Sequence, residues 1–195
     1  MSDHIILLNT IASQHLSKSV AAITSLGIKS WSLQGNGIKI PDGFIISETA
    51  YQEFLNYNYI EGSIRTLLQQ LDHPHYSNLN LVGKQIRQLI LDSDIPYGTQ
   101  ISILSAFNKL RDRSIGEFKV HVKCSVREGV LSEICCSGQA ENHLNLTEDD
   151  DLLNACLACY ASLFNDEAIK YRAANKIDHF KTGPSIAVLI SDETL

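Results

Sequence analysis

The chain has 195 residues, of which 44% are hydrophobic and 19% charged, so it is long and apolar enough to fold around a core. Sixteen Lys and Arg against 22 Asp and Glu give a net charge of −6, which argues against a protein that binds nucleic acid or an anionic membrane. The apolar stretches fall far short of the ~20 residues that cross a bilayer, and the first residues lack the basic start of a secretory signal. We therefore expect a cytoplasmic protein.

The first half of the chain is expected to alternate short strands with helices. Residues 5–8 are a candidate strand, and residues 17–26 a helix that ends at Gly27. Turns are expected at 35–37 and 41–43; the second leads into a strand at 44–46, and a helix then runs from Ser47 or Glu48 to Phe54. The composition relaxes at 71–80, which predicts a loop and the one candidate domain boundary.

The second half carries clearer periodicities. Apolar residues at 79, 82, 86, 89 and 90 predict an amphipathic helix that stops before Pro96, and those at 101, 104, 107 and 110 predict another. Residues 140–146 are a candidate strand, Thr147 and Asp150 a capping pair for a helix that carries apolar residues from 152 to 164, 168–174 a further helix and 185–190 a final strand. Because no regular βαβ period appears, the fold class is α/β or α+β.

Residues 118–126 alternate strictly and predict a strand with two unlike faces. Four residues form a polar, partly cationic face: Lys119, His121, Lys123 and Ser125. The other face consists of Phe118, Val120, Val122, Cys124 and Val126.

The spacing of the cysteines and histidines is only weakly indicative of a metal or redox site. Cys156 and Cys159 have the spacing of redox and zinc sites, but no second pair accompanies them, and we predict reduced thiols in or near the core. The adjacent pair at 135–136 is interpreted in the same way. His73 and His75 are expected to be solvated in a loop.

Two lysines and one loop are candidate phosphate contacts. Lys18 lies near the start of the first predicted helix, where an anion would offset the positive end of the helix dipole, and Lys123 lies on the polar strand face. The glycine-containing loop at 129–138 could approach phosphates through its amide groups. The alternatives are solvated lysines and an ordinary connection.

Several segments, in order, resemble phosphoenolpyruvate synthases and pyruvate phosphate dikinases. Residues 40–55 (IPDGFIISETAYQEFL) resemble that family's VPPGFVITTEAYREFL. Residues 86–90 with 94–96 are similar to the following helix and connector, and VHVKCS at 120–125 stands where the family has VAVRSS. SGQAE at 137–141, CYASLF at 159–164, and the YR and DH pairs at 171–172 and 178–179 resemble AGQQE, CWASLF, YR and DH.

The resemblance implies a fold, a cofactor and a site. The fold is the first lobe of an ATP-grasp-like nucleotide-binding domain, also found in rifampin phosphotransferases, with residues 1–195 as a single domain and a mixed sheet flanked by helices. The implied cofactor is ATP, with magnesium only if a partner completes the site. The implied nucleotide-binding residues are Lys18, Lys123, Ser125, Gly138, Gln139 and Glu141.

Departures from the family pattern bear on activity. The VAVRSS arginine is Lys123, which keeps the charge and loses the bidentate fork, and its first serine is Cys124. The loop that reads TAEDLPEASFAG in the family differs at 127–138, and Lys18 lacks the glycines of the family's VGGKN motif. The family's second lobe, which supplies the magnesium-binding carboxylates, has no counterpart in these 195 residues.

These departures predict a non-catalytic, stand-alone relative that acts as a regulatory or protein-interaction module and binds a protein partner or a second copy. No catalytic or metal-ligating residue is assigned. The alternative is the ATP-binding component of a split phosphotransferase of the phosphoenolpyruvate synthase type, completed by a second polypeptide. A third hypothesis keeps only the sensing of ATP or ADP at low affinity.

Overall fold

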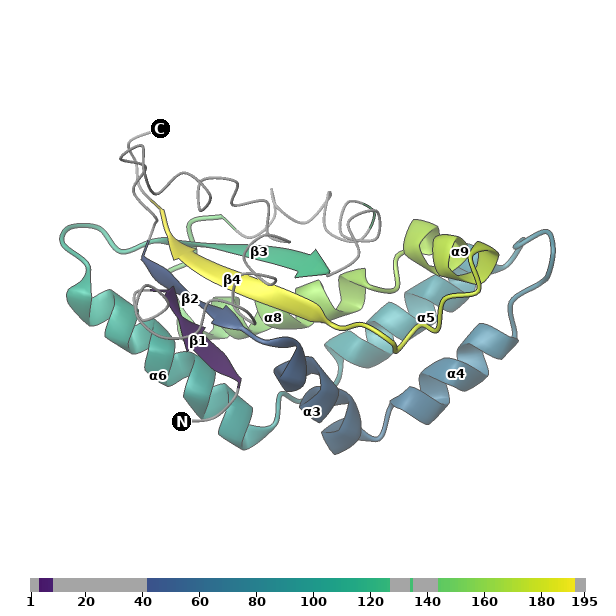
Figure 1. Cartoon of the computed structure of the whole chain (residues 1–195), viewed down its shortest axis with the longest axis horizontal. Helices are drawn as coiled ribbons and strands as arrows, with labels where there is room; N and C mark the ends of the chain where they lie inside the picture. The colour runs from purple at the N-terminus through teal and green to yellow at the C-terminus, as the bar shows by residue number, and fades with distance from the viewer. Residues whose placement is uncertain (1–3, 9–41, 127–133, 135–143, 192–195) are drawn as a thin grey trace.

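The computed structural model describes residues 4–8, 42–126, 134 and 144–191 (Figure 1). Its strands are β1 (Ile5–Leu7), β2 (Gly43–Ile46), β3 (Val120–Val126) and β4 (Pro184–Ile190). Its helices are α3 (Glu48–Asn58), α4 (Glu61–Gln69), α5 (Leu79–Leu91), α6 (Tyr97–Arg113), α8 (Asp149–Ser162) and α9 (Asp166–Ala174). The predicted helix at 17–26 and the turn at 35–37 lie outside the described residues.

The four strands form one sheet in the order β1-β2-β4-β3, so the last strand lies in the interior of the sheet. Val188 of β4 is flanked by Phe44 of β2 and Val122 of β3. The α+β class is confirmed, and each pairing among the described strands is antiparallel rather than mixed. The reason is that β2 and β3, which run in the same direction, are separated by β4, which returns between them.

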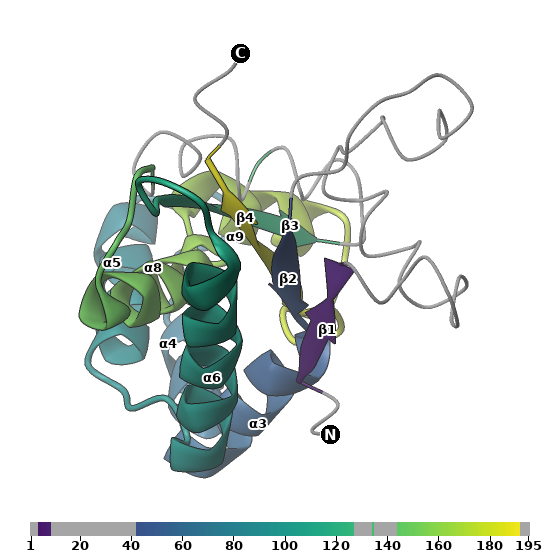
Figure 2. The ribbon, with the colours of Figure 1, turned by 90° about the vertical axis from the view of Figure 1, so that its left-hand side faces the viewer.

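The core lies between one face of the sheet and the helices, which Figure 2 shows beside it. Phe44, Val122 and Val188 point into this core because alternate strand residues share a face. The Tyr160 ring of α8 packs against Tyr51 and another ring of α3, with centroids 5.1 Å apart in both pairs. The cluster draws residues from both sides of the 71–80 loop, so this loop does not separate two cores.

Helix boundaries differ from the expectations at several points. Helix α3 continues past Phe54 to Asn58, and the helix α4 was not predicted. The two are separated at Tyr59, whose φ of 53° is left-handed and ends α3. The capping pair predicted for α8 is wrong: Glu148 is the N-cap, and the Thr147 hydroxyl donates to the Glu148 carboxylate over 3.2 Å instead.

The second half otherwise follows the predicted pattern. Helix α9 begins two residues early because Asn165 caps it, accepting a hydrogen bond of 2.7 Å from the backbone N–H of Ala168. Strand β3 begins at Val120. Of the strand expected at 140–146, residues 140–143 lie outside the described part, and Leu146 forms an isolated bridge with Val120. None of the described helices is both long and apolar enough to span a membrane.

Candidate functional site

The candidate site is the face of β3 that points away from the core. His121, Lys123 and Ser125 occupy this face, and in the sheet register they stand opposite Leu189, Ala187 and Ser185 of β4. This placement confirms the two faces predicted from the alternation, because Val120, Val122 and Val126 lie in the core on the other side. Strand β3 is an edge strand of the described sheet, so this face lies at the edge of the sheet.

Lys123 is the exposed cation of this face. Its ammonium forms no ion pair or hydrogen bond with any residue that the structure describes. The positions across the sheet from it are apolar: Ala187, then Ile45, then Ile6. No carboxylate of the described part therefore neutralises this charge, and the side chain is available to an anion such as a phosphate.

His121 shares the face, two residues before Lys123, and is half-buried. Burial lowers the pKa of its imidazole, and the ammonium of Lys123 lowers it further. The ring is therefore neutral at pH 7. The backbone N–H of Asn145 donates to its Nδ1 over 3.4 Å.

Ser125 lies on the predicted face but is only 1% exposed. Alternation along a strand assigns a residue to a face and does not show what covers that face; Ile45 and Ala187, on the same side, are also fully buried. Four other predicted site residues lie outside the described residues: Lys18, Gly138, Gln139 and Glu141. Of the six predicted site residues, the structure thus places Lys123 and Ser125 on one strand face.

Cys124 points the other way, toward the hydrophobic core. Its replacement of the family's serine is therefore a change on the core side of β3 and does not alter the face that carries Lys123. This departure carries less weight for the site than the sequence alone suggested.

The CxxC cysteines are core thiols, as predicted. Cys156 and Cys159 are free and fully buried in α8, and burial raises the pKa of Cys156 to about 12. The described residues contain no group of three or more His, Cys, Asp or Glu that could hold a metal ion. The pair at 135–136 lies outside the described part, and His73 and His75 are exposed, as expected for loop histidines.

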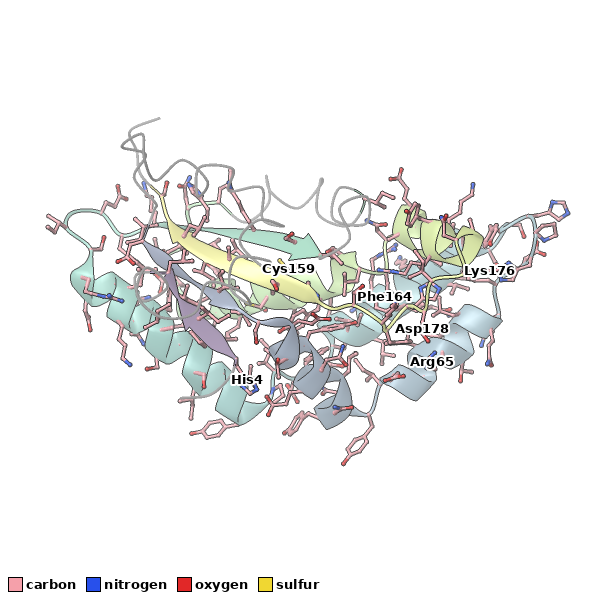
Figure 3. The ribbon with its side chains drawn as sticks, in the orientation of Figure 1. His4, Arg65, Cys159, Phe164, Lys176 and Asp178 are labelled. Carbon is pink, nitrogen blue, oxygen red and sulfur yellow. The ribbon has the colours of Figure 1, made fainter. Side chains whose placement is uncertain are left out.

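Sequence reasoning gave no role to a buried cluster at the far end of the helical layer. The guanidinium of Arg172 is buried; its Nη2 donates to the carbonyl oxygen of Leu163 over 2.6 Å and its Nη1 contacts His179 Nδ1 at 3.3 Å. Arg65 and Asp178 lie beside this cluster, 3.5 Å apart (Figure 3). The resemblance at the YR and DH pairs was the available signal, but it indicated no contact between the two segments.

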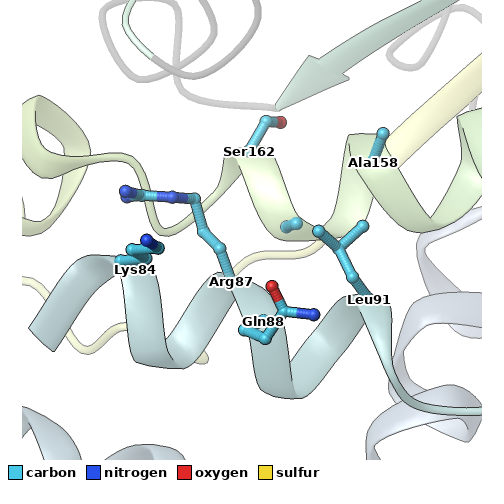
Figure 4. Close-up of a pocket in the computed structure, with 7 residues that line it drawn as sticks. Lys84, Arg87, Gln88, Leu91, Ala158 and Ser162 are labelled. Carbon is cyan, nitrogen blue, oxygen red and sulfur yellow. The ribbon is translucent and has the colours of Figure 1, made fainter. Parts of the chain in front are cut away.

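Two hollows on the described surface are lined by residues other than Lys123. One, of about 240 Å³, lies between α5 and α8 (Figure 4). Arg87 at its edge is engaged in packing, since its Nη1 donates to the Phe164 carbonyl oxygen over 2.7 Å and to Asp166 over 2.9 Å. The other, of about 380 Å³, is lined by Arg65, Leu68, Gln69, His73 and His179.

Comparison with known proteins agrees with the family resemblance found in the sequence. Residues 23–191 match the family described as pyruvate phosphate dikinase, AMP/ATP-binding domain. The chain belongs to this family. The match includes all of β2, β3 and β4, and therefore the strand face that carries Lys123.

Its curated relatives include three bacterial phosphoenolpyruvate synthases. The protein from Aquifex aeolicus is 34% identical over 169 residues, which is 84% of this chain and 19% of the relative. The Synechocystis protein is 35% identical over 170 residues, which is 85% of this chain and 21% of the relative. The protein from Neisseria meningitidis is 35% identical over 156 residues, which is 80% of this chain and 20% of the relative. The chain spans about a fifth of the length of these relatives.

Proposed function

We propose that this chain is a nucleotide-binding lobe that binds the phosphates of ATP or ADP through Lys123. The observation that carries the proposal is the position of that lysine: exposed, without a partner in the described part of the chain, on the family's motif strand and on the face away from the core. The family description, which names AMP and ATP, supports the choice of ligand.

The chemistry of lysine sets the character of this binding. An ammonium is a compact point charge, whereas the guanidinium of the family motif VAVRSS presents two parallel donors to one phosphate. Lys123 therefore attracts the phosphates without fixing their orientation. We expect weaker and less oriented binding than an arginine would give at this position.

We further propose that the lobe alone binds nucleotide without turning it over and acts as a regulatory or protein-interaction module with a protein partner or a second copy. Phosphoryl transfer requires several cations and metal ions directed at the transferred group. One exposed lysine on a sheet margin contacts a ligand from a single side, which suits holding or sensing better than catalysis. Magnesium would then bind only where a partner contributes ligands.

The relatives favour a second candidate, the ATP-binding component of a phosphotransferase of the phosphoenolpyruvate synthase type that a second polypeptide completes. All three relatives above carry that enzyme name, and this chain aligns to about a fifth of each. The two candidates share the Lys123 site and differ in turnover.

Calorimetric titration with ATP and ADP, with and without magnesium, tests the shared site. A charge-assisted hydrogen bond contributes about 1.5–3 kcal/mol, so Lys123→Ala should weaken binding roughly ten- to a hundredfold. Lys123→Arg should retain or strengthen it. Lys84→Ala is the matched control, because Lys84 is an exposed lysine of α5 and not part of the strand face that carries Lys123, and should leave binding unchanged. Equal affinities for the wild type and Lys123→Ala would refute the site.

Phosphate release separates the two candidates. If the chain is a non-catalytic module, the purified chain should release no phosphate from ATP, either alone or with the polypeptides that copurify with it. The split enzyme predicts release only in the mixture, and predicts that Lys123→Ala abolishes it.

A further inference from the structure

A second side chain on β3 is placed to contact whatever anion Lys123 binds. His121 precedes Lys123 by two positions on the same face, so their Cα atoms are roughly 7 Å apart along the strand. The facing residue on β4 is Leu189, which offers no polar group. The family pattern VAVRSS has alanine where this chain has His121, so the imidazole is a feature of this chain beyond the motif.

The hydrogen bond from Asn145 determines which ring nitrogen of His121 carries the proton. A backbone N–H can only donate, so Nδ1 accepts across the 3.4 Å separation and carries the lone pair. In the neutral ring the proton is then on Nε2. No residue in the described part of the chain accepts a hydrogen bond from this Nε2–H.

We propose that the Nε2–H group of His121 donates a hydrogen bond to the same nucleotide phosphates that Lys123 binds. This inference rests on the proposed function and deepens it, since it adds a neutral, oriented donor beside a mobile point charge. The imidazole supplies the orientation that the lysine lacks, because its ring is held at Nδ1 while the ammonium rotates on a flexible stem.

The proposal also implies a pH dependence. At pH 7 His121 donates as a neutral ring, whereas at lower pH a proton on Nδ1 displaces the hydrogen bond from Asn145 and makes the ring a cation beside the phosphate. The charged groups next to His121 in the described chain are Lys123 on one side and, on the other, Lys119 paired with Glu117 at 3.0 Å; β4 contributes the non-titrating Leu189. In the free protein, burial and Lys123 keep the pKa of His121 low. A bound phosphate would stabilise the imidazolium and raise that pKa, so affinity should increase as the pH falls through the range between the two values.

Imidazole NMR with ADP as the probe tests the inference. We expect the free protein to show the Nε2–H tautomer at His121, and ADP to raise the pKa of this ring. The ring resonances of the exposed His75 serve as the control and should not move when ADP is added. His121→Ala should weaken ADP binding roughly tenfold, as for the loss of one hydrogen bond to a charged group, and His121→Gln, which retains an N–H donor, should restore most of it. In His121→Gln, ADP binding should lose the additional pH dependence, while the titration of ADP itself remains common to both proteins.

The outcomes distinguish this inference from the proposed function. If Lys123→Ala weakens ADP binding while His121→Ala binds like the wild type and the His121 pKa is the same with and without ADP, the inference is wrong and the proposed function stands. If the wild type binds no ADP at millimolar concentration, both are wrong.

Discussion

Arg172 donates from Nη1 to Nδ1 of His179 across 3.3 Å, and this contact links the end of α9 to the segment that leads into β4. An arginine can only donate, so His179 is neutral with its proton on Nε2. The ring also stacks on Phe164, with centroids 6.4 Å apart and planes inclined by 19°. A buried cation and a neutral histidine thus join α9 to the end of α8 and to the segment that leads into β4.

The first prediction follows from the charge state of His179. Burial, and after it the positive charge of Arg172, lowers the pKa of His179 to about 4; Asp178 opposes this shift and Arg65 adds to it. Between the unfolded value of about 6.5 and about 4, the unfolded chain therefore binds a proton that the folded protein does not. The free energy of unfolding should fall as the pH falls through this range.

Urea denaturation at a series of pH values measures this dependence. His179→Gln, whose amide oxygen can still accept from Arg172 but does not titrate, should show a flatter profile between pH 6.5 and 4. Parallel profiles for the two proteins would show that His179 does not contribute.

The second prediction concerns Arg172, which is 2% exposed. Arg172→Met should lower the free energy of unfolding by about 3 kcal/mol, because the Leu163 carbonyl oxygen and His179 Nδ1 would lose their donor in the interior. Arg65→Met is the matched control: its side chain is 47% exposed and its pairs with Glu61 and Asp178 are solvated, so the loss should be below about 1 kcal/mol. Equal losses would show that burial does not determine the effect.

The third prediction concerns the centre of the sheet. A Cβ atom at Gly43 would overlap the carbonyl oxygen of Val188 on β4, so Gly43→Ala must displace one strand from the other. We expect a loss of about 3 kcal/mol or more in thermal or urea unfolding. Gly62→Ala makes the same change in α4, where nothing lies within 4 Å, and should stabilise by up to about 1 kcal/mol. A tolerated Gly43→Ala would contradict the described β2–β4 pairing.

What the sequence could predict here was local. The strict alternation at 118–126 located the face of Lys123, and the helical periods around Val82 and Phe107 located α5 and α6, because a side chain's face depends on its own strand or helix. Helix α4 was missed since it has nine residues, a single buried position at Ile64, and follows a left-handed Tyr59. Short segments of this kind carry too few periods to stand out.

Contacts between distant segments could not be predicted. The insertion of β4 between β2 and β3 depends on pairing between strands more than fifty residues apart, and the sequence of a strand does not specify which distant strand it pairs with. The burial of Ser125 depends on what covers its face rather than on its strand. A fully buried Arg172 runs against the usual exposure of arginine and becomes intelligible only when Leu163 and His179 are seen beside it.

The fourth prediction concerns the CxxC thiols. Alkylation requires an accessible thiolate, and Cys156 and Cys159 are fully buried, with the pKa of Cys156 raised to about 12 by burial. Peptide mapping after iodoacetamide treatment at pH 8 should find both unmodified in the native protein and modified in urea, while the half-buried Cys124 reacts faster than either. Rapid native alkylation of Cys159 would contradict its place in the core.

The central claim is that the face of β3 with Lys123 binds nucleotide phosphates, and mapping backbone amide shifts during an ADP titration tests it most directly. We predict saturable shifts centred on residues 121–125 of β3 and 185–189 of β4, which in Lys123→Ala require a much higher ADP concentration. The amides of α4 and of the α5–α8 hollow should stay unchanged. No shift at millimolar ADP, or shifts centred on the hollow that Lys84 and Arg87 line, would contradict the account.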